Sequence, residues 1–283
     1  MTPRFSLIVA TVGRVDEPAR FLASLAAQGE PDWEVLLVDQ NPDERLAPLV
    51  ADWSARMPIA HLRCERGLSR ARNAGLAAAR GEIVAFPDDD CWYPDGLLPR
   101  IAQRLAAAPE LAGLCVRGVD PTGRPLLTGS PETPGPLRRL RVWRQGISIG
   151  LFLRRDAVTA AGGFDERLGA GAGTPWGSGE ETDLLLRLLE SGRALVYDPA
   201  MHVVHPAPSA LADAPGLARA RAYGRGMGEV LRRHALPRRL VAQQLLRALG
   251  GALLSALRGR GGRARLYLAA LRGRWEGYRG LRP

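Results

Sequence analysis

The chain has 283 residues, of which 46% are hydrophobic and 24% charged, so its composition is that of a globular protein and excludes a disordered chain. The formal net charge of +10 is unevenly placed, because the segment from Leu211 onward holds 16 arginines and only three carboxylates. The N-terminus lacks a signal-peptide pattern, and no run of about 18 uncharged apolar residues predicts a transmembrane span.

The first part of the chain alternates apolar runs with amphipathic stretches. The apolar runs predict strands over 5–12, 34–39, 59–64, 83–86 and 111–117. The stretches between them predict helices over 17–28, 42–55, 69–80 and 95–107. Strands and helices that alternate at this spacing indicate βαβ units and a parallel sheet.

After residue 120 the pattern changes. Residues 120–136 are rich in Pro and Gly and predict a loop, and 147–153 is another strand-like run. Residues 162–179 contain too much glycine for regular structure and surround a single tryptophan, Trp176. An amphipathic helix over 181–191 and short strands over 194–197 and 201–204 complete this region.

Three consecutive aspartates, Asp88, Asp89 and Asp90, follow the apolar run that ends at Phe86. Such a run suits a strand buried on both faces of a parallel sheet, and ligands of open α/β sheets bind beyond the carboxyl ends of these strands. Three adjacent carboxylates repel one another unless a cation lies between them. The tract therefore predicts a divalent ion, Mg²⁺ or Mn²⁺, that holds a phosphate-bearing substrate, with a solvated acidic turn as the alternative.

A second acidic cluster, Glu180, Glu181 and Asp183, begins the helix that follows the Gly-rich segment. Carboxylates stabilise the positive end of a helix dipole, so capping is one interpretation. The other is that one of them is a general base, placed where an acceptor enters past a mobile loop. His205, after the last predicted strand, is either a packed polar residue or an imidazole ligand for an acidic metal site.

Other polar residues are candidates for a nucleotide site. Asp39 ends the second predicted strand, where a carboxylate commonly accepts a hydrogen bond from a base or ribose. Arg70 and Arg72 precede Asn73, and guanidinium groups suit phosphates or carboxylates. A solvated helix face is the alternative for these arginines.

Together these segments resemble the family-2 glycosyltransferases of the GT-A fold, over roughly residues 5–206. The order and spacing of four segments carry the resemblance: SLIVATVGR, EVLLVDQ, GLSRARNAGLAAARGEIVAFPDDDCWYP and GGFDE…GSGEETDLLLRLLESG…VVHP. The resemblance implies an α/β fold with a Rossmann-like, mostly parallel sheet flanked by helices. It also implies an inverting transferase whose donor is a nucleotide-diphosphate sugar.

Roles for single residues follow from the same resemblance. Asp88 and Asp90 take the first and third positions of a metal-binding tract, with Asp90 as the direct ligand and His205 completing the metal site. The residues implied to bind the nucleotide sugar are Thr11, Asp39, Arg70, Arg72, Asn73, Asp88 and Asp89. Thr11 would line the nucleotide pocket, and Asp39 would contact the nucleobase.

The implied catalytic base is the second member of a Glu-Asp pair, which corresponds to Glu181. In this chain the pair is Glu180–Glu181, so the base is one methylene longer and Asp183 is a rival. The segment DQNPDE also departs from the common DDGS type, which puts the base and ribose contacts in doubt. We expect Trp176 to stack on an acceptor sugar, with plain packing as the alternative.

Residues 211–283 combine arginines with a leucine stripe on a helical background. The stripe comprises Leu240, Leu245, Leu246, Leu249, Leu253, Leu254 and Leu257. Helices of this make-up lie on anionic membranes, and an appendage packed on the catalytic domain is the alternative. Nucleic-acid binding is not expected, because the segment is mostly Leu and Ala rather than aromatic residues on a polar platform.

We therefore predict a GT-A catalytic domain over residues 1–210 and an Arg-rich amphipathic helical region over 211–283. The expected activity is metal-dependent, inverting sugar transfer to a hydroxyl of a surface glycan or glycolipid, at the cytoplasmic face of the cell membrane. The alternatives are a nucleotidyltransferase, which would release pyrophosphate, and a non-catalytic basic protein that binds membranes or nucleic acid.

Overall fold

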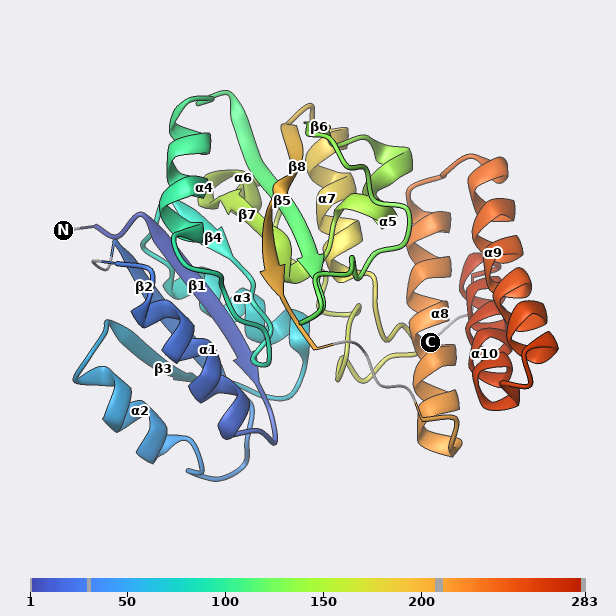
Figure 1. Ribbon diagram of the computed structural model, residues 1–283, viewed down its shortest axis with the longest axis horizontal. Helices are drawn as coiled ribbons and strands as arrows, with labels where there is room; N and C mark the ends of the chain where they lie inside the picture. Colours follow the sequence, from blue (N-terminus) through green and yellow to red (C-terminus); the bar gives the residue numbers. More distant parts are fainter. Residues whose placement is uncertain (1, 30–31, 207–210, 281–283) are drawn as a thin grey trace. The chain divides into compact units, whose positions relative to one another are not determined.

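A mostly parallel sheet organises the computed structural model, which describes residues 2–29, 32–206 and 211–280. Within these residues, eight strands form one sheet in the order β3-β2-β1-β4-β7-β5-β8-β6 (Figure 1). The strands are β1 Phe5–Thr11, β2 Trp33–Asp39, β3 Ile59–Arg63, β4 Ile83–Ala85, β5 Leu111–Val119, β6 Gly135–Pro136, β7 Leu151–Arg154 and β8 Ala194–Val204. Strands β1 to β4 run parallel to one another, and β5 runs parallel to β8. Strand β7 is antiparallel to its neighbours β4 and β5, and β6 is antiparallel to β8. The predicted α/β fold class is confirmed.

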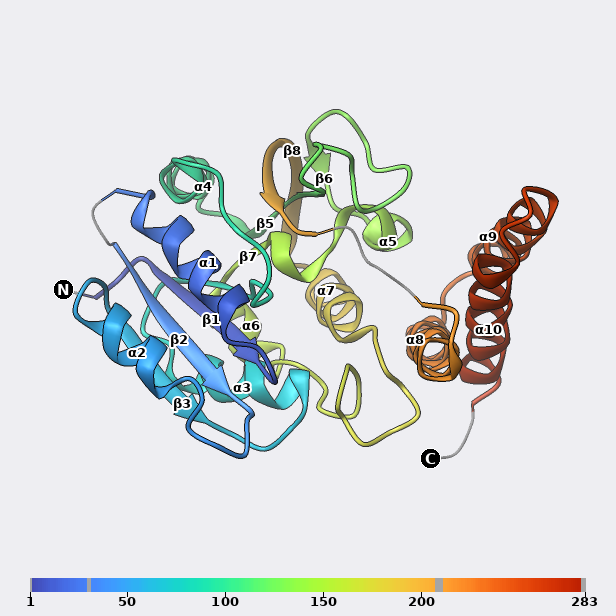
Figure 2. The same cartoon turned by 60° about the horizontal axis from the view of Figure 1, so that its bottom comes forward.

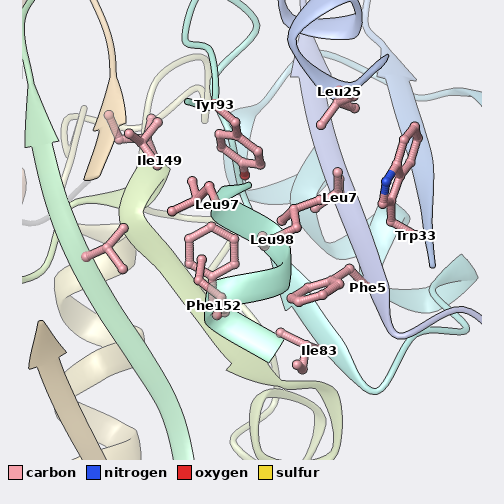
Figure 3. Packing of buried hydrophobic residues seen from close by; sticks show 14 of the residues in the cluster. Phe5, Leu7, Leu25, Trp33, Ile83, Tyr93, Leu97, Leu98, Ile149 and Phe152 are labelled. Atoms are coloured by element: carbon pink, nitrogen blue, oxygen red, sulfur yellow. The ribbon is translucent and has the colours of Figure 1, made fainter. Parts of the chain in front are cut away.

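Helices cover both faces of this sheet. They are α1 Asp16–Ala26, α2 Ala47–Ser54, α3 Leu68–Ala78, α4 Leu97–Ala106, α5 Val142–Gln145, α6 Arg155–Ala160 and α7 Glu180–Glu190. Apolar side chains of α1 and α4 share one buried cluster with the sheet, in which Phe5 and Phe152 pack edge to face with ring centroids 6.5 Å apart (Figure 3). On the other face, a Cβ on Gly75 of α3 would lie 2.4 Å from Cγ2 of Ile8, so this helix packs as closely as glycine allows.

Some elements differ from the predictions in detail. The two short strands predicted near residue 200 are one strand, β8, whose pairing with β5 shifts register between Asp198 and His202. The strand-like run at 147–153 begins with a 3-10 turn, Ser148–Gly150, and becomes β7 only at Leu151. The segment 162–179 forms turns and bends without helix or strand, as its glycine content predicts.

The C-terminal segment forms three helices, α8 Ala214–Arg233, α9 Arg238–Leu257 and α10 Gly261–Tyr278, which lie side by side (Figure 2). Among the helices described, α9 is long and apolar enough to cross a membrane by length and composition alone, with a third of its apolar window (33%) buried. This helix does not meet the criterion of about 18 uncharged apolar residues used on the sequence, because the charged Arg247 interrupts its apolar run.

The chain divides into two compact units that are not contiguous in sequence. The sheet unit comprises Met1–Arg66, Arg70–Phe164 and Leu184–Ala207, and the helical unit comprises Gly67–Ser69, Asp165–Asp183 and Pro208–Pro283. The Gly-rich segment therefore shares a unit with the C-terminal helices, and α7 begins in one unit and continues in the other. The predicted boundary at residue 210 falls on residues 207–210, which lie outside the described part of the chain.

Candidate functional site

The carboxyl edge of the parallel strands gathers the first group of predicted site residues. Thr11 is the last residue of β1 and Asp39 the last of β2, and these two residues are register partners. Asp88 forms a parallel bridge with Ala10 of β1, so the acidic tract begins beside the same strand end. Thr11 and Asp39 are buried, with exposed fractions of 1% and 0%. Thr11, Asp39 and Asp88 therefore lie at the carboxyl edge of the sheet, as the sequence predicted.

Asp88, Asp90 and His205 form a group that could hold a metal ion. One ligand atom from each lies within 4.8 Å of the others. His205 reaches the tract because the end of β8 pairs with Trp92, whose backbone N–H donates to the Val204 carbonyl at 2.9 Å. Carboxylate oxygens with one imidazole nitrogen are a donor set that suits Mn²⁺ or Mg²⁺, so these residues fit the predicted ion.

Two arginines balance the charge of the acidic tract. Nη1 of Arg14 lies 2.6 Å from Oδ1 of Asp89 and 2.7 Å from Oδ2 of Asp90. Nη2 of Arg72 lies 3.2 Å from Oδ1 of Asp88, and the Arg72 side chain is only 2% exposed. Arg72 was predicted from the sequence, but Arg14 was missed. The sequence feature that could have identified Arg14 is its position in the turn directly after β1.

The electrostatics of the tract follow from these contacts. Burial alone would raise the pKa of Asp90, but the hydrogen bond from His205 and the charge of Arg14 lower it below its ordinary value. Burial alone would lower the pKa of His205, but Asp90 raises it. For Asp89, burial prevails and raises the pKa. Asp90 is thus kept ionised, as a metal ligand must be.

Asp39, predicted to contact a nucleobase, is a fully buried acceptor. Its Oδ1 accepts from the backbone N–H and the side-chain amide of Asn41, at 2.8 and 2.7 Å. Its Oδ2 accepts from Arg63 at 3.1 Å and lies 3.0 Å from Nε2 of His61. Sequence reasoning missed all three partners. The signal for two of them is the alternation of polar residues along β3, since Arg63 is the register partner of Asp39.

The remaining α3 candidates differ in their surroundings. The Asn73 side chain donates to the Phe164 carbonyl at 2.9 Å and accepts from the Phe164 N–H at 2.8 Å, which ties α3 to the start of the Gly-rich segment. Arg70 is half-buried and donates to the Arg66 carbonyl at 2.9 Å. Their predicted contacts with the donor diphosphate stay predictions.

The second acidic cluster occupies the first turn of α7. Glu180 and Asp183 are each 5% exposed, whereas Glu181 between them is partly exposed. Oδ1 of Asp183 lies 2.9 Å from Nε2 of His234. Glu180 lies against Gly169, where a Cβ would be 3.2 Å from the Glu180 carboxylate and the backbone φ of +102° favours glycine.

Trp176, the predicted acceptor platform, is 6% exposed. The guanidinium carbon of Arg233 lies 5.3 Å from the centre of its ring, within the range of a cation–π contact. The glycosyl-acceptor role of Trp176 stays a prediction. Trp176, Glu180, Glu181 and Asp183 all belong to the helical unit, whereas Asp88, Asp90 and His205 belong to the sheet unit.

Several sequence relatives of the chain are named as glycosyltransferases. The family described as "Glycosyl transferase family 2" matches residues 6–152. The chain is 30% identical over 186 residues to the pre-mycofactocin glycosyltransferase of Mycobacterium tuberculosis, which covers 62% of this chain and 37% of that protein. It is 29% identical over 223 residues to the O-antigen biosynthesis protein RfbC of Myxococcus xanthus, covering 75% of this chain and 16% of that one. The chain thus spans well under half the length of these relatives.

Two solved structures share the GT-A fold with this chain. The mannosyltransferase PcManGT from Pyrobaculum calidifontis, solved with GDP-Man and Mn²⁺, superposes with a TM-score of 0.67 at 17% identity, covering 98% of this chain and 87% of that one. TarS 1–349 of S. aureus superposes with a TM-score of 0.59 at 18% identity, covering 98% and 92%. At these identities the likeness shows the fold alone.

The family match over residues 6–152 covers more than half of the sequence. The chain therefore belongs to glycosyl transferase family 2.

Proposed function

We propose that the protein transfers a sugar from a nucleotide-diphosphate sugar to a hydroxyl acceptor, with inversion at the anomeric carbon. The observation that carries the proposal is the convergence of Asp88, Asp90 and His205 at the carboxyl edge of the sheet. Two structural neighbours were solved with such donors, TarS with UDP-GlcNAc and PcManGT with GDP-Man. The relative named for O-antigen biosynthesis supports a surface glycan as the product.

The sheet unit would bind the donor. Asp88, Asp90 and His205 would hold Mn²⁺ or Mg²⁺, and the bound ion would supply positive charge for the departing nucleoside diphosphate. Arg72 is buried against Asp88, so it adds a fixed positive charge at this edge. Arg14 has a side chain that is 42% exposed, so a donor phosphate can reach its guanidinium group.

We assign the general base to Glu181. Glu180 and Asp183 are buried, and Asp183 accepts a hydrogen bond from His234, whereas Glu181 is partly exposed and can meet an acceptor hydroxyl. A carboxylate that removes the hydroxyl proton on the side opposite the leaving group gives direct displacement and inversion. The accessibility of Glu181 favours it over its rival, Asp183.

The function is tested by incubating the protein with UDP-, GDP- and dTDP-sugars, with and without Mn²⁺. We expect one donor to raise the melting temperature in the presence of Mn²⁺ and to release a nucleoside diphosphate when an acceptor is added. Asp90→Ala should abolish both effects. Release of pyrophosphate would instead indicate nucleotidyl transfer, and full activity of Asp90→Ala would overturn the proposal.

We further propose that the helical unit attaches the protein to the cytoplasmic face of an anionic membrane. On α9, Leu246, Leu253 and Leu257 are 64%, 58% and 86% exposed, and their spacing places them on one helical face. The opposite face of α9 is buried, with Leu240, Val241, Gln244, Ala248, Ala252 and Ser255. Exposed arginines flank the leucines, among them Arg247, Arg258 and Arg260. An apolar face bordered by cations complements an anionic lipid surface.

A further inference from the structure

The C-terminal helices share their compact unit with the segment that carries the proposed base. We propose that helix α8 and the residue that follows it, His234, position the catalytic segment 176–183, and that Arg233 and His234 are positioning residues of the reaction. This inference rests on the proposed function, because it assigns the base to Glu181. All residues that carry it lie in the helical unit.

The backbone of the catalytic segment lies directly on α8. The Gly177 N–H donates to the Ala222 carbonyl at 3.0 Å, and the Ser178 hydroxyl donates to the Tyr223 carbonyl at 2.9 Å. A Cβ on Gly226 would lie only 2.0 Å from the Ser178 carbonyl oxygen. At that distance no side chain fits, so Gly226 is required for the segment to reach the helix.

The contact continues for three turns along one face of α8. Ala222, Gly226, Val230 and Arg233 follow one another at intervals of four, four and three residues, which is the spacing of a single helical face. Val230 meets Gly179: a Cβ on that glycine would be 2.9 Å from a Val230 methyl. The segment is therefore held along its length and not at one point.

Arg233 adds the side-chain part of this contact. Its guanidinium group bonds the Asp165 carboxylate and lies over the Trp176 ring. Glu229 holds the same guanidinium from within α8, with Oε1 2.6 Å from Nε. Arg233 thus joins both ends of the Gly-rich segment to the helix.

His234 holds the catalytic segment at Asp183, on the C-terminal side of the proposed base Glu181. Its imidazole donates to Oδ1 of Asp183 at 2.9 Å, and both side chains are nearly buried, at 7% and 6% exposed. The next residue, Ala235, has a φ of +45°, a left-handed conformation that non-glycine residues rarely adopt. Glu181 therefore lies between two anchors, the Gly226 contact at Ser178 and the His234 contact at Asp183.

The test compares His234→Ala and Arg233→Ala with the full-length wild type. Because the residues that would bind the donor lie in the sheet unit, donor and Mn²⁺ affinities measured by calorimetry should stay at the wild-type values. A displaced base should lower kcat by about 10- to 100-fold. The matched control is Arg232→Ala on the same helical turn, since the Arg232 side chain is 46% exposed and forms an ion pair with Glu229 of the same helix. Its kcat should stay within about twofold of the wild type.

A second pair of variants separates positioning from folding. His234→Gln keeps an N–H donor at the place of Nε2 and should restore most of the lost kcat, whereas His234→Phe keeps the ring volume and should not. A folded His234→Ala or His234→Phe with wild-type kcat overturns the inference, as does a loss of donor affinity equal to the loss of kcat. If the wild type itself transfers no sugar, the proposed function fails instead.

Discussion

Asp90 contacts two basic side chains, with Arg14 at one carboxylate oxygen and His205 at the other. An ion bound at Asp90 must therefore coexist with both groups. His205 can serve as a ligand itself, but the Arg14 guanidinium carries a fixed charge and repels a divalent cation. Because its side chain is 42% exposed, Arg14 can move toward solvent or toward a donor phosphate. At the proposed metal site, Arg14 would therefore compete with the ion until a donor is bound.

We expect Arg14→Gln to bind Mn²⁺ more tightly than the wild type in the absence of a donor. Removing one positive charge a few ångströms from the ion relieves repulsion on the order of 1–2 kcal/mol, which corresponds to roughly a tenfold gain in affinity. Calorimetric titration with Mn²⁺ measures the change. Arg139→Gln, which removes an arginine paired with Glu190, is the control and should leave the affinity unchanged. Weaker Mn²⁺ binding by Arg14→Gln would contradict this role.

The positions of the site residues were predictable from the sequence, but their hydrogen-bond partners were not. Thr11, Asp39 and Asp88 each follow an apolar run, and parallel strands bring their carboxyl ends to one edge, so their convergence was predictable. The environment of Asp39 was not, because it depends on the register of β2 with β3, which sets Arg63 beside it. No tight turn joins β2 to β3, so their register is set by tertiary packing and cannot be read from the sequence of either strand.

Among the elements, α8 and α10 pack with their backbones in contact. Gly224 and Gly228 of α8 and Gly273 and Gly277 of α10 lie in this interface, each pair spaced four residues apart. A Cβ on Gly228 would lie 2.2 Å from the Arg274 carbonyl oxygen. Small residues at this spacing let two helices approach closely. The leucine pattern of the sequence does not reveal this glycine interface, and Leu240 of the predicted leucine stripe is buried, at 6% exposed.

The glycine interface predicts opposite effects for two Gly→Ala substitutions. A Cβ on Gly277 would be 2.1 Å from the Arg225 carbonyl oxygen, so Gly277→Ala should destabilise the helical unit by about 1–3 kcal/mol. Gly250 of α9 has nothing within 4 Å, so Gly250→Ala should stabilise by about 0.5–1 kcal/mol through helix propensity. Urea unfolding followed by tryptophan fluorescence distinguishes the two. A stabilised Gly277→Ala would show that the helices are farther apart.

Glu276 of α10 links the same two helices electrostatically. Hydrogen bonds from Arg221 hold its pKa at about 2, well below its ordinary value, and Arg225 contributes as well. A lowered folded-state pKa adds stability above the ordinary carboxylate pKa, and this stability is lost as the pH falls from there toward 2.

Glu276→Gln should therefore destabilise the protein at pH 7, by on the order of 1 kcal/mol because solvent still screens the pair. The difference from the wild type should shrink as the pH falls below about 4.5, where the carboxylate begins to be protonated in the unfolded chain. Unfolding midpoints measured between pH 7 and pH 3 test the trend. A difference that stays constant over this range would mean that Glu276 contributes packing and not charge.

At the scale of the whole molecule, the helical unit combines two proposed tasks. Its α8 surface holds the catalytic segment, while its α9 surface presents leucines to solvent. Removing everything after residue 209 would abolish both together, so truncation is a poor test of membrane attachment. Substitutions on the exposed face of α9 are a better one, because they leave the α8 contacts intact.

We expect the triple variant Leu246→Ser, Leu253→Ser, Leu257→Ser to lose binding to phosphatidylglycerol vesicles by at least about 100-fold. The wild type should sediment with these vesicles and remain in solution with uncharged phosphatidylcholine vesicles. Leu140→Ser, at a residue of the sheet unit that is 40% exposed, is the control and should bind as the wild type does. Undiminished sedimentation of the triple variant would refute the attachment.

Helix α8 uses one face for the catalytic segment and another, two residues out of step, for α10. Gly226 lies in the first contact and Gly228 in the second, so neither position tolerates a larger residue. The catalytic segment and α10 are therefore both held at fixed places along α8. If the proposed transfer is correct, a laboratory selection for changed acceptor preference could act through Ala222 and Val230, because these side chains contact Gly177 and Gly179 of the catalytic segment.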